Sequence, residues 1–369
     1  MDTLTKLKLL GEGAKYDICS TVNGGCAPGV CQSFTPDGRC ISLLRVLMSN
    51  QCQRDCSYCP NQVARDLPRA AFTPEELARL FMEFYRRNYV SGLFLSSGVI
   101  DTADGAMDKM LAAVELLRKR YRFAGYIHLK LIPGCSPGHI QEAVRLAQRV
   151  SVNCETPDGE TLRILSRSKD YQRDIIGAME EVRKLTAAER GRQSTQFIVG
   201  AAGERDQDIL ARSLEFYRRY QMQRIYFSAY VSLDNAAERP GTPLLRERRL
   251  YQCDFLLRQY GFDLEELEFQ GGNLPLDQDP KLAWARAHPE RFPLEVNRAG
   301  RRELLRVPGI GPRSADRILQ VRREQAITSE QELKNLGVVV KRAAPFLLVR
   351  GKSLRPGPTV DYRQLSWDW

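Results

Sequence analysis

A regular alternation of short apolar runs and longer amphipathic segments extends from residue 40 to residue 260 and constrains the fold more than any other feature. Six apolar runs have the length and composition of strands, and a segment with helical periodicity follows each one. The runs cover residues 40–48, 91–97, 124–132, 149–154, 195–199 and 224–231, and the helical segments cover residues 72–88, 106–121, 137–148, 171–185, 206–220 and 246–260. A strand–helix–strand order produces parallel pairs with right-handed crossovers. We therefore predict an α/β fold in which these segments form a partial (β/α)6 barrel of the TIM type.

The segments on either side of this alternation differ from it in composition. Residues 1–40 form a leader rich in Cys and Gly, and the barrel core is expected over residues 41–270. Residues 271–296 are rich in Pro and Asp, which is typical of a connector. Residues 297–350 are expected to form a small all-α domain, and residues 351–369 form a tail without periodicity.

Composition excludes disordered and membrane-spanning classes of protein. The chain has 369 residues, of which 43% are hydrophobic, so it has enough apolar side chains to fill a core. No apolar run approaches the roughly 18–20 residues of a membrane span. Lys6, Lys8 and Glu12 interrupt the N-terminal segment, so we expect no export. In a reducing cytoplasm the ten cysteines are expected to be metal ligands or catalytic thiols rather than disulfides.

The charge of the chain is unevenly distributed. Lys and Arg number 55 against 45 Asp and Glu, which gives a formal net charge of +10. Residues 297–350 contain 12 Lys or Arg and 5 Asp or Glu, and this excess of seven accounts for most of the imbalance. A local basic excess attracts polyanions, nucleic acids first. An ordinary Arg-rich surface is the alternative.

The most specific motif directly follows the first predicted strand. It reads Cys52-Gln-Arg-Asp-Cys56-Ser-Tyr58-Cys59, a CxxxCxxC triplet. Three thiolates can bind three irons of a [4Fe–4S] cluster and leave the fourth iron open for the amino and carboxylate groups of a ligand such as S-adenosylmethionine. Structural zinc is the alternative, although it usually takes four ligands in paired C-x2-C motifs, and no fourth Cys or His follows closely.

The triplet, with an aromatic residue before its last cysteine, resembles the radical SAM superfamily, whose signature is CxxxC-x-aromatic-C after the first barrel strand. The resemblance implies that Cys52, Cys56 and Cys59 bind a [4Fe–4S] cluster and that Tyr58 lies beside the cofactor. It also implies that the reduced cluster gives one electron to S-adenosylmethionine, which yields methionine and a 5′-deoxyadenosyl radical that abstracts hydrogen from an unreactive carbon. The protein then supplies orientation and shielding from water and oxygen.

The same resemblance assigns further S-adenosylmethionine contacts at the C-terminal ends of the strands, the catalytic face of such barrels. Ser96-Ser97-Gly98 stands where the family often has Gly-Gly-Glu, a segment that contacts the amino group largely through its backbone, although the glutamate is absent here. Asn153 and Glu155 stand where the family often holds the ribose hydroxyls, and Gly200 lies in a segment similar to the one that passes the adenine. For Ser96-Ser97-Gly98 the alternative is a simple strand-to-loop turn. For Asn153 and Glu155 it is helix capping, and for the segment of Gly200 it is a plain strand end.

A second motif, Val307-Pro-Gly309-Ile310-Gly311-Pro-Arg313, lies between two short amphipathic segments. Its glycines permit a tight hairpin with exposed backbone amides, and a hairpin that leads into a helix N-terminus can bind anions. The pattern resembles a helix-hairpin-helix motif, which grips DNA phosphates without reading sequence. The resemblance implies that Gly309, Ile310, Gly311 and Arg313 bind DNA, and a simple turn between two helices is the alternative.

A weaker copy of this motif follows 29 residues later. In that register Arg342 corresponds to Arg313 and Ala344 to Ala315, and Val338 and Val340 replace the two glycines. We therefore expect the second copy to lack a phosphate site and to serve packing.

The combination of the two motifs resembles one bacterial family, the radical SAM proteins of DNA modification or repair that are associated with uracil-DNA glycosylase. The likeness covers nearly the whole chain and includes the connector PLDQDPKLAWARAHPERFPLEVNRA. It implies DNA as substrate, an electron donor such as flavodoxin or ferredoxin, and a glycosylase-type partner protein. Two alternatives stay open: a radical SAM enzyme that modifies RNA or tRNA, and a non-catalytic DNA-binding iron–sulfur protein.

Other polar side chains have two interpretations each. Cys154, next to Asn153, is the one candidate catalytic residue, as a hydrogen donor to a product radical, and a small buried residue is the alternative. Lys130 can reach the carboxylate of S-adenosylmethionine or lie on a solvated surface. Four leader cysteines can bind an auxiliary iron–sulfur cluster or remain unliganded: Cys19, Cys26, Cys31 and Cys40.

Overall fold

The computed structural model describes residues 1–14, 29–34, 40–187, 189–233 and 240–354. The chain divides into two compact units. Unit 1 comprises Met1–Glu204 and Arg212–Thr242, and unit 2 comprises Arg205–Ala211 and Pro243–Trp369. A search of the described helices finds none that is both long enough and apolar enough to cross a membrane.

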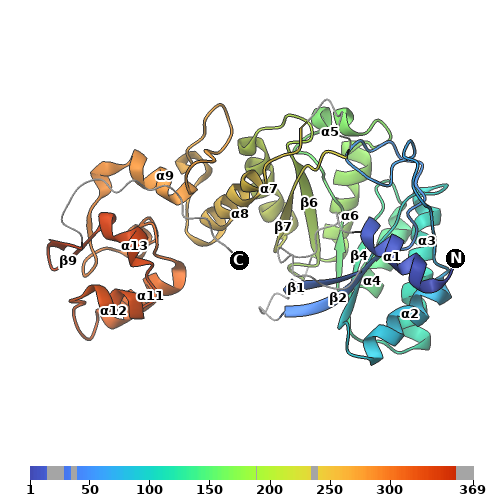
Figure 1. Cartoon of the computed structure of the whole chain (residues 1–369), viewed down its shortest axis with the longest axis horizontal. Coiled ribbons are helices and arrows are strands. Elements are labelled where there is room, and N and C mark those ends of the chain that lie inside the picture. Colours follow the sequence, from blue (N-terminus) through green and yellow to red (C-terminus); the bar gives the residue numbers. More distant parts are fainter. Residues whose placement is uncertain (15–28, 35–39, 188, 234–239, 355–369) are drawn as a thin grey trace. The chain divides into compact units, whose positions relative to one another are not determined.

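A seven-stranded sheet curled into a half-barrel forms the centre of unit 1 (Figure 1). Its strands lie side by side in the order of the chain, with β1 antiparallel to β2 and every later pair parallel. The strands are β1 (Val30–Phe34), β2 (Cys40–Leu47), β3 (Gly92–Ser96), β4 (Tyr126–Lys130), β5 (Arg149–Ser151), β6 (Gln193–Val199) and β7 (Ile225–Ala229). The six parallel strands confirm the predicted partial barrel, whereas β1 is an addition that the sequence did not predict.

Helices follow the parallel strands and lie around the outer face of the sheet (Figure 1). They are α2 (Pro74–Arg86), α3 (Ala103–Glu115), α4 (Pro137–Leu146), α6 (Gly177–Leu185) and α7 (Asp206–Tyr220), and a π-helical turn at Leu116–Arg120 continues α3 while another at Tyr171–Ile176 precedes α6. Their positions agree with the predicted helices to within a few residues. Two further helices, α1 (Thr3–Gly13) and α5 (Gly159–Leu165), were not predicted.

The start of α2 shows how local sequence sets an element boundary. The Thr73 hydroxyl accepts a hydrogen bond from the Glu76 amide at 3.2 Å, and the Glu76 carboxylate accepts one from the Thr73 amide at 2.9 Å. This reciprocal cap satisfies amides that the first helical turn leaves without partners, and Pro74 fits the first position because it has no N–H. Leu77 and Phe81, four residues apart, are then buried on one face.

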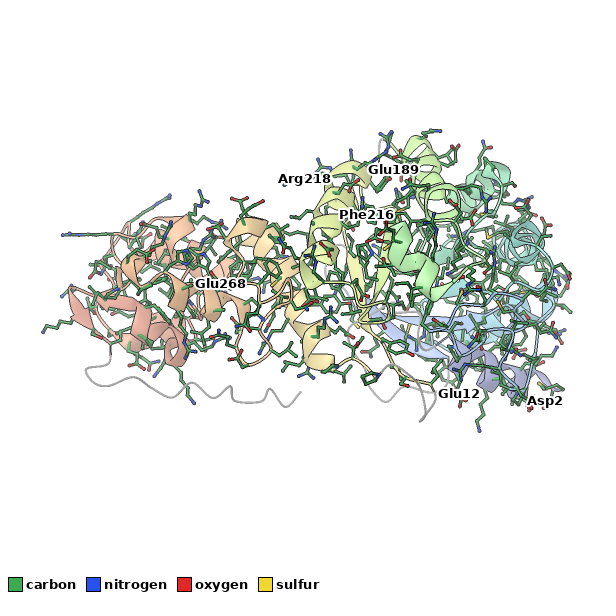
Figure 2. All side chains as sticks on the ribbon, turned by 90° about the horizontal axis from the view of Figure 1, so that it is seen from above. Asp2, Glu12, Glu189, Phe216, Arg218 and Glu268 are labelled. Atoms are coloured by element: carbon green, nitrogen blue, oxygen red, sulfur yellow. The ribbon has the colours of Figure 1, made fainter. Side chains whose placement is uncertain are left out.

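Alternate residues of the strands form two different surfaces. One set is apolar and completely buried, as at Leu129 of β4 and Phe197 of β6. Phe216 of α7 is also fully buried and stacks on Phe197 with ring centroids 6.3 Å apart, whereas Arg218, two residues on, is exposed (Figure 2). The other set is polar and buried, with members such as His128 and Ser194 lining a small cavity inside the sheet. The half-barrel therefore has an apolar outer layer and a polar interior.

Unit 2 combines short helices with a small sheet. The helices are α8 (Leu244–Gln259), α9 (Pro280–Ala287), α10 (Arg301–Leu304), α11 (Pro312–Val321), α12 (Glu330–Asn335) and α13 (Val340–Ala343). The sheet pairs β8 (Leu294–Glu295) in parallel with β9 (Leu347–Val349), which pairs with β10 (Lys352–Ser353) in antiparallel fashion. The prediction of an all-α C-terminal domain is therefore wrong, because strands of two or three residues are too short to show an alternation in the sequence.

The segment expected to be a connector is a packed part of unit 2. Residues 271–296 include α9, whose Trp284 is 1% exposed. Its indole packs edge-on against Phe262, with ring centroids 5.5 Å apart, and stacks on His288. The segment 246–260, assigned above to a core ending at residue 270, forms α8 and also belongs to unit 2.

Candidate functional site

One pocket of unit 1 lies at the C-terminal ends of the strands. It has a volume of about 140 Å³ and is lined by the loop after β2 and by residues at the ends of β3 to β7. In barrels of parallel strands this edge carries the functional residues, because several loops converge there. Side chains of the cysteine triplet and most of the predicted cofactor contacts line this pocket together, namely Cys52, Cys56, Cys59, Tyr58, Ser96, Ser97, Gly98, Asn153 and Glu155.

The three cysteines of the triplet are free thiols on one loop. Cys56 is buried, and Cys52 and Cys59 are half-buried. The Arg54 amide donates to Cys52 Sγ at 3.4 Å, and an N–H aimed at sulfur stabilises the charge of a thiolate ligand. Three thiols on one pocket wall fit the expected [4Fe–4S] cluster with one open iron. Among the described residues no three His, Cys, Asp or Glu side chains are grouped so as to hold a single metal ion.

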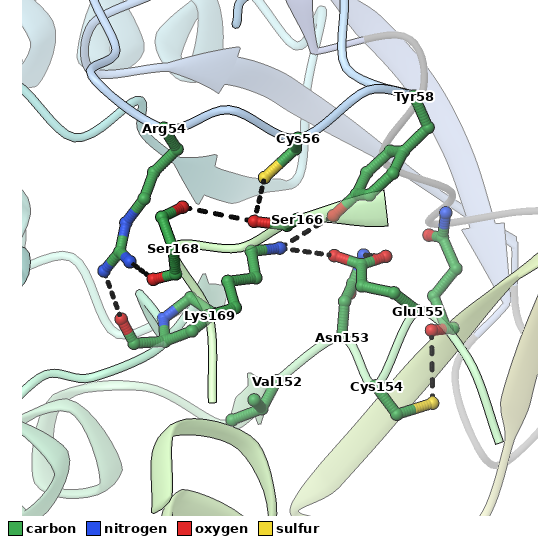
Figure 3. Close-up of polar contacts among 12 residues, drawn as sticks. Arg54, Cys56, Tyr58, Val152, Asn153, Cys154, Glu155, Ser166, Ser168 and Lys169 are labelled. Carbon is green, nitrogen blue, oxygen red and sulfur yellow. Dashed lines mark hydrogen bonds and ion pairs between the residues drawn. The ribbon is translucent and has the colours of Figure 1, made fainter. Parts of the chain in front are cut away.

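A four-residue segment directly after α5, residues 166–169, anchors the cysteine loop (Figure 3). The Asp55 carboxylate accepts hydrogen bonds from the Ser166 and Ser168 hydroxyls, both at 2.6 Å, and from the Arg167 amide at 2.9 Å. Burial by itself raises the pKa of Asp55, but these hydrogen bonds outweigh it and hold the pKa well below its usual value. Asp55 therefore stays ionised and fixes the loop between Cys52 and Cys56.

The neighbouring Arg54 holds the loop from a second direction. Its guanidinium donates to the Ser168 carbonyl and, at 3.2 Å, to the Pro133 carbonyl after β4 (Figure 3). The Ser166 hydroxyl also lies 3.7 Å from Cys56 Sγ. Because a cluster ligand is tuned by the polar groups around its sulfur, Ser166 belongs to the environment of Cys56.

Lys169 links the cysteine loop to the end of β5. Its ammonium donates to the Tyr58 hydroxyl at 2.7 Å and to Glu155 Oε1 at 3.2 Å (Figure 3). The Lys169 and Glu155 side chains are only 8% and 4% exposed, so this is a buried ion pair. Burial alone lowers the pKa of Lys169, but the negative charges of Cys56 and Glu155 outweigh it and raise the pKa above its usual value.

The backbone at Glu155 is strained. Its φ of 64° lies in the left-handed region, which a residue with a Cβ seldom adopts. The Glu155 amide donates to the Gln196 carbonyl at 3.0 Å, and the Ile198 amide donates to the Glu155 carbonyl at 2.8 Å. These two bonds hold Glu155 against β6 and turn its carboxylate into the pocket. Strain of this kind persists where the surrounding structure fixes it, often at functional sites.

Gly98 is required by packing at the end of β3. A Cβ there would lie 2.3 Å from the Gln51 carbonyl oxygen, and the Gly98 amide donates to the Ser49 carbonyl at 2.7 Å. The strand end therefore approaches the start of the cysteine loop closely, and only glycine permits this contact. Lys130, at the end of β4, also lines the pocket.

Two predicted site residues lie outside the lining of this pocket. Gly200 has φ +84° and donates its amide to the Glu204 carboxylate, which also accepts from the Ala202 amide at 2.9 Å, so Glu204 closes a turn at the end of β6. Cys154 is 0% exposed and its thiol donates to the Gln196 carbonyl at 3.4 Å. Burial raises the pKa of Cys154 above its usual value. Cys154 is thus buried outside the pocket lining, and its role as a hydrogen donor stays a prediction.

The sequence analysis missed the residues that hold the cysteine loop: Arg54, Asp55, Ser166, Ser168 and Lys169. Arg54 and Asp55 stand inside the triplet, but the segment that binds them lies more than a hundred residues later in the chain. The only local signal was a run of hydroxyl and basic side chains, Ser166-Arg-Ser-Lys169, directly after a helix end.

Unit 2 contains two helix–turn–helix hairpins, one between α10 and α11 and one between α12 and α13. Their turns correspond residue by residue. Gly309 and Gly337 have φ of +87° and +85°, and the residues after them, Ile310 and Val338, are 1% and 4% exposed. Gly311 and Val339 then cap the second helices.

The predicted register of 29 residues between the hairpins is therefore wrong by one. The structural offset is 28, so the first glycine is retained as Gly337 and only Gly311 is replaced, by Val339. Ala315 corresponds to Ala343, and both are completely buried. The sequence register failed because it followed the helical residues after the turn, whereas the left-handed glycine determines the shape of the turn.

The two hairpins are packed directly against each other. The Val339 amide donates to the Gly309 carbonyl at 2.9 Å, and the Ser314 hydroxyl donates to the Gly337 carbonyl at 2.7 Å. A Cβ on Gly309 would lie 2.5 Å from the Val339 carbonyl oxygen. Gly309 is thus required by conformation and packing, whether or not a phosphate binds there.

Part of the basic excess of unit 2 is used internally. Arg306 is 4% exposed, and its guanidinium donates to the Glu266 carboxylate at 2.7 Å and to the Gly261 carbonyl at 2.8 Å. Arg322 donates to the Ala299 carbonyl at 2.6 Å. Arg313, beside the first turn, is exposed. Only the exposed basic residues can attract a polyanion, so the effective charge of this region is smaller than its composition indicates.

The leader cysteines fall partly outside the described residues. Cys19 and Cys26 lie there, Cys40 is an exposed free thiol, and Cys31 is disulfide-bonded, against the expectation of reduced thiols. The auxiliary iron–sulfur cluster stays a prediction.

Residues 46–212 match the radical SAM superfamily. This part of the chain, which carries the cysteine loop and strands β3 to β6, is a radical SAM domain, and the protein is an enzyme of the radical SAM type. A domain of this type implies a [4Fe–4S] cluster and S-adenosylmethionine as cofactors. No curated protein matches the chain.

Several solved structures are similar to part of the chain. HydG, a maturase of the [FeFe]-hydrogenase, is 14% identical with a TM-score of 0.47, and the match covers 57% of this chain and 48% of that chain. Methylornithine synthase (PylB) is 15% identical with a TM-score of 0.47, and the match covers 57% and 60%. A radical SAM methyltransferase from Sphaerobacter thermophilus is 14% identical with a TM-score of 0.44, over 60% and 68%. The chain spans about half to three fifths of the first two structures.

Proposed function

We propose that this radical SAM enzyme acts on DNA, and that its two-hairpin unit binds the DNA backbone while the half-barrel carries out repair or modification of a base or sugar. The observation that carries the proposal is the presence, in one chain, of a three-cysteine pocket and of a hairpin whose turn precedes the N-terminus of α11. Neither part alone indicates a nucleic-acid enzyme.

The residues of the pocket divide into two groups by the cofactor they would hold. Cys52, Cys56 and Cys59 would ligate the cluster, and the polar groups at the strand ends would hold S-adenosylmethionine. When bound, the two cofactors supply a 5′-deoxyadenosyl radical. Glu155 presents a carboxylate suited to the two ribose hydroxyls, and Lys169 fixes its orientation. Asp55 and Arg54 keep the cysteine loop in place during this chemistry.

The first hairpin supports the DNA assignment. Gly311 caps α11 without a side-chain hydrogen bond, so the first amides of a ten-residue helix remain available for an anion. Arg313 is exposed next to them. Contacts of this type hold phosphates in a salt-dependent way and carry no sequence preference. In the second hairpin Val339 replaces the glycine cap, which favours a packing role.

The position of the pocket limits how a DNA substrate can meet the radical. The pocket lies among strand ends and loops, and a base stacked within a duplex is covered by its neighbours, so the reacting nucleotide must leave the stack. Unstacking costs a few kcal/mol, and less for a damaged base. The electron donor, such as flavodoxin or ferredoxin, and a glycosylase-type partner belong to the same proposal and rest on the family resemblance.

An anaerobic cleavage assay tests the proposal. The full chain, reconstituted with iron and sulfide and reduced with dithionite, is incubated with S-adenosylmethionine alone, with damaged duplex DNA and with tRNA. We expect 5′-deoxyadenosine to accumulate fastest with DNA. A larger increase with tRNA would support the RNA-modifying alternative, and equal rates in all three reactions would refute a nucleic-acid substrate.

Binding is measured separately from chemistry. Replacement of Arg313 by Gln should weaken retention on immobilised duplex DNA, so that the variant elutes at lower salt than the wild type. Arg120→Gln, at an exposed site in unit 1, is the matched control with the same loss of charge. If both variants elute at the same salt concentration, the hairpin is not the DNA contact.

A further inference from the structure

Unit 2 contains a pocket that is larger than the cysteine pocket of unit 1. Its volume is about 400 Å³, within the range of sites that bind small molecules. Four separate segments form it: the end of α8, the start of α9 and the turns of both hairpins. Because no short element builds this pocket alone, it is a product of the tertiary fold of unit 2.

The rim of this pocket is apolar and exposed. Phe255 of α8 is 39% exposed, and Val339, in the second hairpin, is 46% exposed. In the described part of unit 2 the other exposed large hydrophobic side chain is Leu244, which does not line the pocket. Two of three such side chains thus gather at one opening. Exposed apolar groups concentrated at a concave site mark a binding surface more often than isolated ones do.

The floor of the pocket carries two basic side chains, Lys281 and Arg342, and the Asp279 carboxylate. Lys281 is 7% exposed; its ammonium donates to the Ile310 carbonyl at 2.6 Å and lies 4.7 Å from the centre of the Tyr260 ring. Arg342 Nη2 lies 3.1 Å from Asp279 Oδ2. That single contact leaves further guanidinium donors for another anion. The turn of the first hairpin, Gly309 to Gly311, forms the adjoining wall.

We propose that this pocket binds one unpaired nucleotide of a DNA strand. The base would stack on Phe255 and contact Val339, and the phosphate would face Arg342 and the turn of the first hairpin. An apolar rim above a guanidinium group and a backbone turn matches the two halves of a nucleotide. A base paired within a duplex cannot present its face to Phe255, because its neighbours cover it. The inference rests on the proposed function and adds that the hairpin unit recognises single-stranded or unstacked DNA.

The alternative is that the pocket is a packing defect between helix ends. That interpretation accounts for the volume, but it gives no reason for the exposure of Phe255 and Val339 at a shared opening. It also predicts that both side chains can be truncated without effect on binding. The two interpretations therefore differ in one measurable quantity, the affinity for unpaired DNA.

Fluorescence anisotropy with the full chain measures this quantity. The probes are a labelled single-stranded DNA oligonucleotide, the duplex of the same sequence and the RNA strand of the same sequence, at one fixed salt concentration. The loss of one stacked base reduces affinity by roughly tenfold. We expect Phe255→Ala to bind single-stranded DNA about tenfold more weakly and to bind the duplex as the wild type does. Leu244→Ala is the matched control, and Phe255→Tyr should restore binding.

Four results would overturn the inference. If Phe255→Ala and Leu244→Ala have equal effects, or if Phe255→Ala weakens single-stranded and duplex binding equally, the pocket is not a nucleotide site, although the DNA proposal survives. Tighter binding of RNA than of DNA would refute the choice of DNA. If the wild type binds none of the three probes even at low salt, the proposed function and this inference both fail.

Discussion

The cysteine pocket of unit 1 and the hairpin pocket of unit 2 are built in opposite ways. In unit 1 the pocket is narrow, about 140 Å³, and its ionic groups are buried and paired, as Lys169 and Glu155 are. In unit 2 the pocket is about 400 Å³, and its rim carries the exposed side chains of Phe255 and Val339. Buried, fixed charges suit a cofactor that must react in one orientation. An open pocket with an apolar rim suits a ligand that enters from solvent. The pocket of unit 1 is therefore suited to catalysis, and the pocket of unit 2 is suited to the recognition of a ligand.

The largest expected effect is the loss of cluster chemistry in unit 1 with no change in DNA binding by unit 2. Cys56→Ala removes a cluster ligand, so the reconstituted variant should lose bound iron, visible colour and cleavage of S-adenosylmethionine. DNA binding by unit 2 should not change. Iron content and 5′-deoxyadenosine formation measure the first effect, and anisotropy measures the second. Cys40→Ala, at an exposed free thiol, is the control. If Cys56→Ala cleaves S-adenosylmethionine at the wild-type rate, the triplet does not bind the catalytic cluster.

The next effect concerns the buried ion pair of unit 1. Lys169→Met leaves the Glu155 carboxylate buried without its ammonium partner, and the loss of one partner of a buried pair costs about 3–5 kcal/mol. We expect a lower free energy of unfolding, together with weaker binding of S-adenosylmethionine in equilibrium dialysis. Lys184→Met removes a lysine that is 66% exposed and paired with Glu181, so its cost should stay below about 1 kcal/mol. Equal costs in the two variants would show that the Lys169 pair is not structural.

A third effect tests the hairpins of unit 2. Gly309→Ala forces a Cβ onto a residue with φ +87° and against the Val339 carbonyl, so it should cost about 2–3 kcal/mol of stability. Gly311→Ala is the matched control, because its φ is −99° and the nearest atom to its Cβ would be the Tyr260 hydroxyl at 3.4 Å. Chemical denaturation measures both variants. If Gly309→Ala has the same free energy of unfolding as the wild type, the packed arrangement of the hairpins is wrong.

The smallest effect depends on pH. Burial raises the pKa of Glu266, but a hydrogen bond from the Asp263 amide and the Arg306 guanidinium together hold it below its usual value. A depressed folded-state pKa stabilises the fold above the unfolded-state value, about 4.3, and this contribution is lost as the pH falls through the folded-state pKa. Glu266→Gln should therefore cost about 1.5 kcal/mol at pH 7.

Urea unfolding of this variant and the wild type, compared at pH 7 and in the acid range, provides the measurement. The difference in unfolding free energy should shrink below about pH 4. Glu290→Gln, at a 64% exposed carboxylate, is the control and should show no difference at either pH. A cost that does not depend on pH would show that the charge of Glu266 is not the cause.

The sequence predicted the repeating part of the fold and the chemically distinctive part of the site. The strands from β2 to β7 were recognisable because each apolar run is followed by a helix long enough to show its period. The short strands β8, β9 and β10 were missed because their pairing depends on contacts between distant residues. The cysteine triplet carries its own spacing, so it was found. Lys169 was missed, because a single lysine has no pattern until the fold brings it to Glu155 and Tyr58.

The anchoring of the cysteine loop has a thermodynamic consequence for cofactor assembly. Small zinc modules stay unfolded until the metal arrives, and the free energy of metal binding then provides the folding free energy. Here the hydrogen bonds of Arg54 and Asp55 and the ion pair of Lys169 order the loop through protein contacts alone. The conformational entropy that these contacts remove from the loop is lost when the chain folds. Cluster binding therefore does not have to provide the free energy for that part of the ordering.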